Sequence, residues 1–255
     1  RIAADNICGI PTTFGGPQGS SVIKVFDMTV ATTGINQKTA QSLGLDCEAV
    51  VLSPSSHAGY YPGARTMTMK VLFERGTYKL LGAQIVGYDG VDKRIDVLAT
   101  AMRAGLKAYE LTELDLAYAP PYSSAKDPVN MAGYMIENMK NGLVKQFSYA
   151  DIAGLTADDG AFLLDARTPA EYAAGHAKGF VNIPLDDLRS RIGEVPKAKR
   201  VYVMCHSGLR SYLACRILAQ NGYTCYNFSG GYAFLRAVAS GGGMPSEMFA
   251  CGMEK

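Results

Sequence analysis

Charge is scarce in this sequence. Asp, Glu, Lys and Arg make up 19% of the 255 residues, against about a quarter in an ordinary soluble protein. The net charge is only +2, and no run of Lys and Arg is longer than two or three residues. A protein that binds a phosphate backbone concentrates more positive charge than this. We therefore do not expect a nucleic-acid partner, and the low charge suggests that another protein covers part of the surface.

Long apolar runs and targeting segments are also missing. No stretch approaches the roughly 20 consecutive apolar residues that a membrane span needs, and no signal peptide is visible. The cysteines are scattered without a C-x-x-C pair, which favours reduced cytoplasmic thiols over a disulfide framework or a zinc site. The sequence therefore predicts a cytoplasmic protein without a membrane span or a bound metal. The cysteines are Cys8, Cys47, Cys205, Cys215, Cys225 and Cys251.

The sequence also lacks a dinucleotide-binding motif and an initiator Met. No G-x-G-x-x-G opens a β-α-β unit, so the usual dinucleotide-binding fingerprint is missing. The Gly-rich stretch 15–19 follows no strand-to-helix pattern, and we interpret it as a loop. The chain begins without an initiator Met, and residues 1–9 have the pattern of a helix end that closes on Gly9. We expect a fragment of a longer protein that binds no cofactor by itself.

Residues 1–145 have the pattern of an α+β domain, in which an antiparallel sheet carries helices. β-Branched and aromatic residues predict the strands, and Gly76 marks a short hairpin between two of them. Apolar spacing predicts one helix, and Asp127 is a suitable N-cap for another. The expected strands are 22–30, 66–74 and 78–86, and the expected helices are 91–106 and 127–142.

Residues 146–240 alternate between strand and helix patterns, which predicts an α/β domain with a mainly parallel sheet. A capping box from Thr168 to Glu171 begins a short helix. The segment 241–255 starts with three glycines, and we expect it to be a flexible tail. The expected strands are 161–165, 201–204 and 224–228, and the helix after the second of these is 210–220.

The segment C-H-S-G-L-R-S, residues 205–211, lies between an apolar strand and a helix. A loop at that position turns backbone N–H groups inward, at the positive end of the helix dipole. These groups favour the anionic, nucleophilic form of a sulfur, which can attack sulfane sulfur and become a persulfide. Glycine in the loop allows the tight backbone path. We expect catalysis by Cys205 and Arg210, and a persulfide cradle formed by His206, Ser207, Gly208, Leu209 and Ser211.

Two other interpretations of Cys205 stay open. It could be a small buried apolar residue at the end of a strand, which is what we expect of Cys215 and Cys225. It could also be the nucleophile of a phosphatase, which uses a thiolate, an amide loop and an Arg. A phosphatase loop needs a longer interval to surround a tetrahedral anion, whereas four residues separate Cys205 from Arg210. The shorter loop between Cys205 and Arg210 forms a smaller ring of amides, which suits a single sulfur atom better than a phosphate.

Further motifs accompany this loop. They are D-A-R-T-P-A-E-Y at 165–172, G-H-A-K-G-F-V-N-I-P at 175–184 and G-G-Y at 230–232. Together with the Cys205 loop they resemble a single-domain rhodanese over nearly the whole second half. The resemblance implies that Asp165, Arg167 and His176 shape or support the pocket. A purely structural role for these three residues is an equally good interpretation.

The first half resembles a second known module. The motifs are G-S-S-V at 19–22, D-M-T-V-A-T-T-G at 27–34, H-A-G-Y-Y-P-G at 57–63 and Y-A-P-P-Y-S-S-A-K-D-P at 118–128. They resemble the dimerisation domain of flavin-dependent pyridine nucleotide–disulfide reductases, in particular coenzyme A disulfide reductases fused to a rhodanese domain. The resemblance implies that FAD, NAD(P)H and coenzyme A belong to the full-length parent protein, whose flavin and nicotinamide domains lie upstream.

The same resemblance implies a homodimer in which this domain reaches the partner subunit's flavin and redox cysteine. A phenol there would hydrogen-bond a thiolate or a coenzyme A sulfur and stabilise developing charge. Ordinary interface or core packing of aromatic residues is the alternative. The residues concerned are Tyr60 and Tyr118, with Tyr61, Tyr122 and His57 as neighbours.

Together these features predict the sulfur-transfer and dimerisation portion of a flavin-dependent, NAD(P)H-driven reductase of coenzyme A disulfide, persulfide or polysulfide. The expected partners are a second copy of the chain and small sulfur compounds, namely thiosulfate, polysulfide and coenzyme A persulfide. We expect no reductase activity without the flavin domains. The main alternative is a non-catalytic module that dimerises and binds a sulfur carrier, and a Cys-dependent phosphatase ranks below it.

Overall fold

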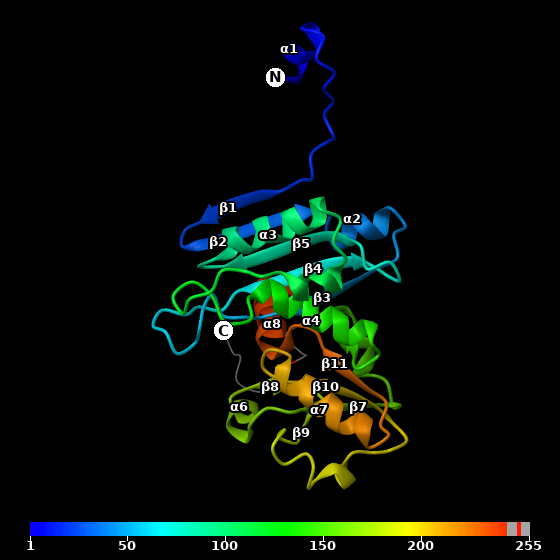
Figure 1. The fold of residues 1–255 in the computed structure, drawn as a ribbon. Helices are drawn as coiled ribbons and strands as arrows, with labels where there is room; N and C mark the ends of the chain where they lie inside the picture. The colour runs from blue at the N-terminus through cyan, green and yellow to red at the C-terminus, as the bar shows by residue number, and fades with distance from the viewer. Residues whose placement is uncertain (244–248, 251–255) are drawn as a thin grey trace.

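Two β-sheets of different kinds form the body of the protein (Figure 1). The structure is a computed structural model that describes residues 1–243 and 249–250. The first sheet has the strand order β1-β2-β5-β4-β3, and all of its pairs are antiparallel. The second has the order β6-β11-β10-β7-β9, and its pairs are parallel. The predicted sequence of an antiparallel and then a mainly parallel sheet is confirmed.

The first sheet carries its helices as the sequence predicts. α3 packs on β2 and β5 through apolar residues at helical spacing, including Val91, Ile95 and Leu98. The side chain of Asp127 accepts the N–H of Val129 and so caps α4, as predicted. The elements are α1 (Ile2–Ile7), β1 (Ser21–Val25), β2 (Met28–Gly34), α2 (Gln37–Ser42), β3 (Cys47–Leu52), β4 (Thr68–Glu74), β5 (Leu80–Gly87), α3 (Val91–Arg103), η1 (Ala108–Glu113) and α4 (Pro128–Lys140).

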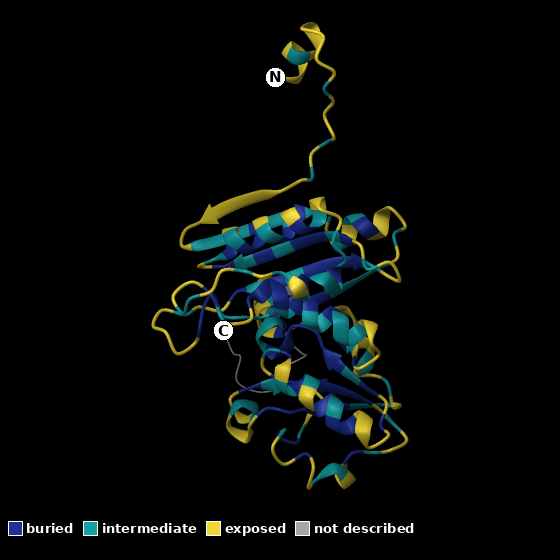
Figure 2. Ribbon diagram, in the orientation of Figure 1, coloured by how far each residue is buried: buried dark blue, intermediate teal, exposed yellow. Residues whose placement is uncertain are grey.

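The single strand predicted at 22–30 is wrong, because the chain turns within it. β1 ends at Val25, residues 26 and 27 form the turn, and β2 runs back beside β1. Phe26 has a φ of 53°, the left-handed backbone that a two-residue hairpin turn requires. No Gly or Asn marks this turn in the sequence, and β-branched residues lie on both sides of it. β1 is exposed along its whole length (Figure 2).

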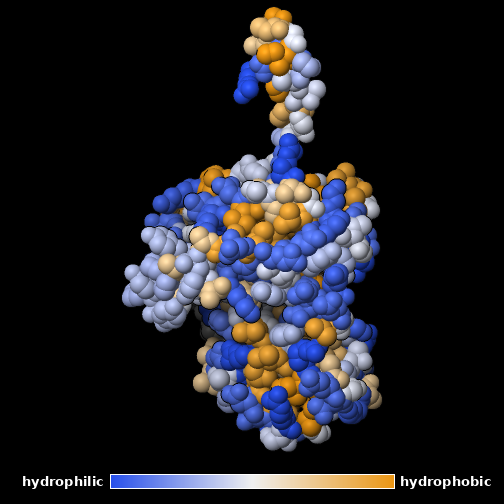
Figure 3. Space-filling view, viewed as in Figure 1, coloured by the Kyte–Doolittle hydropathy of each residue, from blue (hydrophilic) through white to orange (hydrophobic). Residues whose placement is uncertain are grey.

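The second sheet places β10 between β7 and β11, so its carboxyl end lies at the centre of one sheet edge. Cys205 is the first residue after β10, and α7 follows it after a short loop. On the face shown in Figure 3, apolar side chains gather over α7, which exposes Leu209 and Leu213. The elements are β6 (Lys145–Phe147), η2 (Tyr149–Asp151), α5 (Ile152–Leu155), β7 (Ala161–Asp165), α6 (Pro169–Ala173), β8 (His176–Ala177), β9 (Val181–Asn182), η3 (Ile192–Glu194), β10 (Arg200–Met204), α7 (Leu209–Gln220), β11 (Cys225–Phe228) and α8 (Gly231–Val238).

Part of the segment predicted to be a flexible tail has regular structure. A π-helix, η4 (Ala239–Gly243), continues α8. β12 (Phe249–Ala250) pairs antiparallel with β8. The rest of that prediction, including Cys251, lies outside the described residues. Within the described residues, no helix combines the length and apolar character needed to cross a bilayer.

The two sheets are joined through the turn that precedes α8. The hydroxyl of Ser229 accepts a hydrogen bond of 2.8 Å from the backbone N–H of Val51 in β3. Ser53 lies close by and donates to the carbonyl of Gly230 at 3.5 Å. Met139 of α4 packs against the cores of both halves. The second domain is therefore fixed against the first next to the Cys205 loop.

A buried ion pair holds the loops of the first domain. Arg94 in α3 is 1% exposed and Asp127 is 3% exposed, with an Nη2–Oδ2 distance of 3.0 Å. The same guanidinium donates to the carbonyl of Ser56 at 2.9 Å and to the hydroxyl of Ser123 at 3.2 Å. It thereby ties the loop before β4 to the loop before α4. Sequence reasoning did not single out Arg94, because its partners come from other segments of the chain.

Replacing Arg94→Met should destabilise the protein by about 3–5 kcal/mol, because the buried Asp127 carboxylate would lose its guanidinium partner and keep only the Lys93 ammonium at 3.9 Å. The control is Arg75→Met, which removes an exposed guanidinium paired with Asp46 and Glu48 and should change stability by no more than about 1 kcal/mol. Urea unfolding of both variants measures the difference. Similar losses for the two variants would contradict this assignment.

Candidate active site

The loop between β10 and α7 sets the position of the reactive sulfur. Cys205 is 1% exposed. Gly208 is the N-cap of α7, and its φ of 105° lies where only glycine is comfortable. The start of α8 holds the loop from the other side, because the N–H groups of Tyr232 and Ala233 donate to the carbonyls of Cys205 and His206. The loop is thus fixed at both ends by helix N-termini.

Two hydrogen-bond donors point at the Cys205 sulfur. The backbone N–H of Gly208 donates to Sγ at 3.1 Å. The buried Ser211 hydroxyl lies 3.2 Å from Sγ and 3.1 Å from the Gly208 carbonyl, and its single proton serves one acceptor at a time. An anionic sulfur is the stronger acceptor of the two. The sulfur therefore has one amide donor and one hydroxyl donor where the sequence predicted a ring of amides.

Arg210 is held by a carboxylate, and its guanidinium does not point at the sulfur. Its Nη1 and Nη2 atoms each donate to an oxygen of Glu171 in α6 at 2.6 Å, a bidentate pair. This pairing holds the pKa of Glu171 well below its usual range and raises that of Arg210. Glu171 also completes the predicted capping box with Thr168. Sequence reasoning found the cap and missed the ion pair.

Asp165 and Arg167 form a buried pair below the pocket. Their Oδ2 and Nη2 atoms are 2.6 Å apart, and both side chains are almost fully buried. Arg167 also donates to the carbonyl of Gly175 at 3.0 Å, and its guanidinium lies 3.9 Å from the centre of the Tyr232 ring. His176 is directed elsewhere: its ring stacks on Tyr172 and does not line the pocket. The arrangement favours a supporting role for all three predicted residues.

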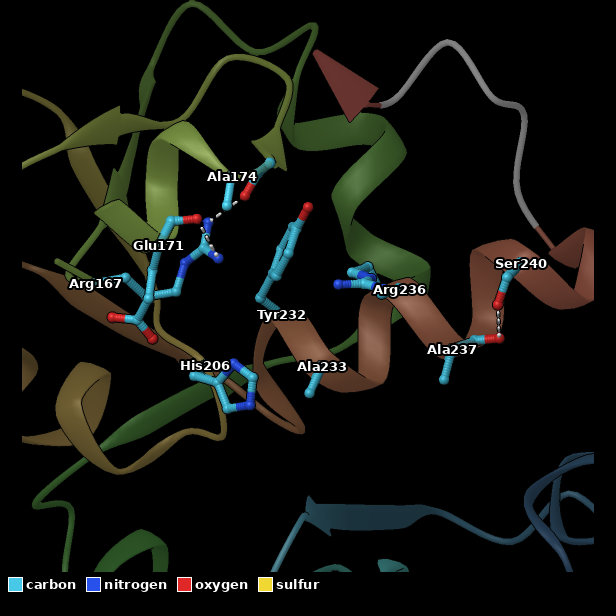
Figure 4. A pocket seen from close by; sticks show the side chains of 10 residues that line it. Arg167, Glu171, Ala174, His206, Tyr232, Ala233, Arg236, Ala237 and Ser240 are labelled. Atoms are coloured by element: carbon cyan, nitrogen blue, oxygen red, sulfur yellow. Dashed lines mark hydrogen bonds between the residues drawn. The ribbon is translucent and has the colours of Figure 1, made fainter. Parts of the chain in front are cut away.

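A cavity of about 470 Å³ lies beside the loop (Figure 4). His206 lines it from the loop, and Glu171 and Arg167 line it from the α6 side. Tyr232, Arg236 and Ser240 line it from α8 and its continuation. The sequence analysis did not name these last three as site residues. Their spacing of four residues, which places them on one helix face, is the signal that could have found them.

The predicted loop residues face two different sides. His206 lines the cavity of Figure 4, whereas Ser207, Gly208 and Leu209 line a second cavity toward the first domain. Cys215 and Cys225 are buried in the core, as predicted. Burial raises the pKa of the Cys215 thiol, so this sulfur stays protonated. Among the described residues, no cluster of His, Cys, Asp and Glu is suited to a metal ion.

The predicted tyrosines gather on two loops of the first domain, away from the two cavities beside the Cys205 loop. The hydroxyl oxygens of Tyr60 and Tyr118 are 3.1 Å apart, and Tyr60 is 78% exposed. This hydrogen bond raises the pKa of Tyr118, so the phenol stays neutral. The Tyr61 ring meets the buried His57 ring edge-on at 5.7 Å. Tyr118 and Tyr122 line a further cavity of about 550 Å³.

Family comparisons match the two halves of the chain to two different families. Residues 20–129 match the dimerisation domain of pyridine nucleotide-disulphide oxidoreductases, and residues 148–235 match the rhodanese-like domain. Coenzyme A disulfide reductase of Staphylococcus haemolyticus is 46% identical over 126 residues, which are 49% of this chain and 28% of that protein. The Staphylococcus aureus enzyme is 42% identical over 134 residues, 52% of this chain and 30% of that protein.

Two solved structures resemble almost the entire chain. The reduced CoADR-RHD of Bacillus anthracis has a TM-score of 0.92 and 44% identity over 98% of this chain and 44% of that chain. An NAD-dependent persulfide reductase from A. fulgidus has a TM-score of 0.81 and 37% identity over 92% of this chain and 42% of that chain. The chain thus spans less than half the length of these four relatives. It consists of a pyridine nucleotide-disulphide oxidoreductase dimerisation domain followed by a rhodanese-like domain, the C-terminal arrangement of its coenzyme A disulfide reductase and persulfide reductase homologues.

Proposed function

We propose that Cys205 carries sulfane sulfur as a persulfide. The observation that carries this proposal is the pair of donors on Sγ, the Gly208 amide and the Ser211 hydroxyl, at the N-terminus of α7. Donors at a helix N-terminus stabilise negative charge. A thiolate at this position is stabilised, and so is the terminal sulfur of a persulfide, which extends beyond Sγ towards the loop amides.

The transfer runs in two displacement steps. The Cys205 thiolate attacks the outer sulfur of thiosulfate, the S–S bond of the donor breaks, and sulfite leaves with the electron pair. An acceptor thiolate then attacks the terminal sulfur of the Cys205 persulfide, and the Cys205 thiolate leaves. No net oxidation or reduction occurs at the protein. Arg236, which lines the adjacent cavity, is the cation best placed to attract an anionic donor.

In this proposal Arg210 does not contact the sulfur; Glu171 holds its guanidinium in position. The bidentate pair fixes its guanidinium beside the loop, where its charge adds to the field at Cys205. The same pairing argues against a phosphatase, because a phosphatase needs its Arg free to grip the phosphate. Sulfur transfer is therefore the reaction that this loop supports best.

We further propose that this chain is the sulfur-transfer and dimerisation part of a longer NAD(P)H-driven flavoprotein that reduces coenzyme A disulfide, persulfide or polysulfide. The first sheet is antiparallel, so it does not form the β-α-β unit that binds a dinucleotide, and other domains of the longer protein would hold FAD and NAD(P)H. Exposed Tyr60 and neutral Tyr118 would face the partner subunit across a homodimer. The described cysteines are all free thiols, which supports a cytoplasmic location.

Replacing Cys205→Ser should lower thiosulfate sulfurtransferase activity by on the order of 10³-fold or more, because the nucleophile is removed. A cyanide acceptor and detection of thiocyanate measure the rate. Cys8→Ser is the matched control, since Cys8 is an exposed free thiol of the same chain, and it should keep full activity. Activity retained in Cys205→Ser would remove this residue from the mechanism.

Replacing Glu171→Gln should destabilise the protein by about 0.5–1 kcal/mol at pH 7, because the ion pair with Arg210 is about a third exposed. Gln can keep the hydrogen bonds from Thr168 through its single oxygen, but it loses the charge and one of the two hydrogen bonds from Arg210. The native pKa of Glu171 is depressed, so this contribution is complete above the ordinary Glu pKa of about 4.3 and declines as the pH falls below it. Urea unfolding at pH 7, 5 and 3 should give equal differences at the first two values and a smaller one at the third. A difference that disappears by pH 5 would contradict the pairing.

A further inference from the structure

A second cavity of about 240 Å³ lies where the two domains meet. Met131 and Met135 of α4 line one side of it, and Leu209 and Tyr212 of α7 line another. Residues of α4, of the second sheet and of the Cys205 loop all line it. The described residues that line this cavity include no Asp, Glu, Lys or Arg. Its wall is therefore uncharged, and it mixes apolar side chains with hydroxyl and amide groups.

One of those polar groups is buried without a partner for its oxygen. Asn227 in β11 is 2% exposed. Its Nδ2 donates to the carbonyl of Gly208 at 3.3 Å. Because a carbonyl can only accept, this contact fixes the amide orientation and turns Oδ1 away from Gly208. Within the described part of the chain, Oδ1 has no hydrogen-bond donor in reach.

A second unpartnered oxygen lies beside the first. Gln146 in β6 is the register partner of Asn227 across the parallel pair, so both side chains leave the sheet on the same face. Gln146 also lines the cavity, and its Oε1 finds no donor among the described residues. A buried polar atom left unpaired costs about 1–3 kcal/mol. Two neighbouring acceptors on one wall therefore favour a ligand that brings two donors.

We propose that this cavity binds an uncharged aliphatic primary amide. Its NH₂ group carries two hydrogens that diverge by about 120°, so acceptors at hydrogen-bond distance from its nitrogen lie about 5 Å apart. Neighbouring strands, and hence Asn227 and Gln146, are spaced by about 4.8 Å. One NH₂ group can therefore donate to both oxygens, while the alkyl part contacts Met131, Met135 and Leu209.

Charged ligands fit this wall less well. A carboxylate has no hydrogen to donate and would face two amide oxygens. An alkylammonium would be buried without a counter-charge, because the described lining holds no carboxylate. An ester of the same shape lacks the N–H donors. The Asn227 and Gln146 oxygens therefore favour the neutral amide over the carboxylate and the ester, because both oxygens need a donor.

The bound amide would be coupled to the reactive sulfur through Gly208, whose carbonyl contacts Asn227 and whose N–H contacts Cys205. Asn227 donates to the Gly208 carbonyl, and the Gly208 N–H donates to Cys205 Sγ. A donor on Asn227 Oδ1 polarises this side-chain amide and strengthens its bond to Gly208. The carbonyl and the N–H of Gly208 belong to different peptide groups, so the coupling is mechanical: the ligand holds Gly208, and with it the loop, in place. This regulatory consequence rests on the proposed function of Cys205, whereas binding itself does not.

Isobutyramide is a suitable probe, with methyl isobutyrate and isobutyrate as controls that lack the NH₂ group. Saturation-transfer NMR on the full chain should give a Kd in the millimolar range for the amide and no measurable binding for either control. Gln146→Leu should weaken amide binding about tenfold, because one acceptor is lost. Gln84→Leu is the matched control: it removes a Gln with a buried, unpartnered Nε2 far from this cavity, and it should leave the Kd unchanged.

Equal binding of amide and ester, no amide binding, or an unchanged Kd in Gln146→Leu would each overturn the site. The coupling is tested by alkylation with monobromobimane, followed by peptide mass analysis. The amide should slow modification of Cys205 several-fold and leave that of Cys8 unchanged, and an unaltered Cys205 rate would overturn the coupling. Both tests use protein without a sulfur donor, so their outcome is independent of whether Cys205 carries a persulfide.

Discussion

The hydrogen bond from the Gly208 amide to the Cys205 sulfur is the contact on which the proposed chemistry depends. It forms because the chain reverses between β10 and α7 within a few residues, with a left-handed glycine as the cap of the helix. Gly231 is equally necessary, since a Cβ there would collide with the backbone of His206. Two helix N-termini thus converge on one loop and make it a favourable site for negative charge.

Both domains fix their functional loops with the same device, a buried Arg–Asp pair. Arg167 pairs with Asp165 and uses its remaining donors on backbone carbonyls near α6. Arg94 pairs with Asp127 and binds the carbonyls of the loops that carry the tyrosines. Such pairs add little net stability over apolar packing, yet breaking one leaves a buried charge. Their contribution here is to fix loop geometry.

The features that could be predicted from sequence are those specified by neighbouring residues. The capping box at Thr168, the N-cap at Asp127 and the strand–loop–helix around Cys205 each depend on a few consecutive positions. The Glu171–Arg210 pair could not be foreseen, because 39 positions separate its members. The neighbouring unpartnered oxygens of Gln146 and Asn227 could not be foreseen either, because their proximity depends on the register of β6 against β11. The turn at Phe26 was hidden because strand-forming residues flank it on both sides and no glycine marks it.

The central claim is that an anionic sulfur is held at the carboxyl end of β10. A crystal of the protein soaked in thiosulfate tests it most directly, with anomalous scattering to locate sulfur atoms. We expect one additional sulfur bonded to Cys205 Sγ, within hydrogen-bond distance of loop N–H groups, and none on Cys215 or Cys225. An unmodified Cys205 thiol, packed against apolar side chains with carbonyl oxygens around it, would show that this loop does not hold an anionic sulfur.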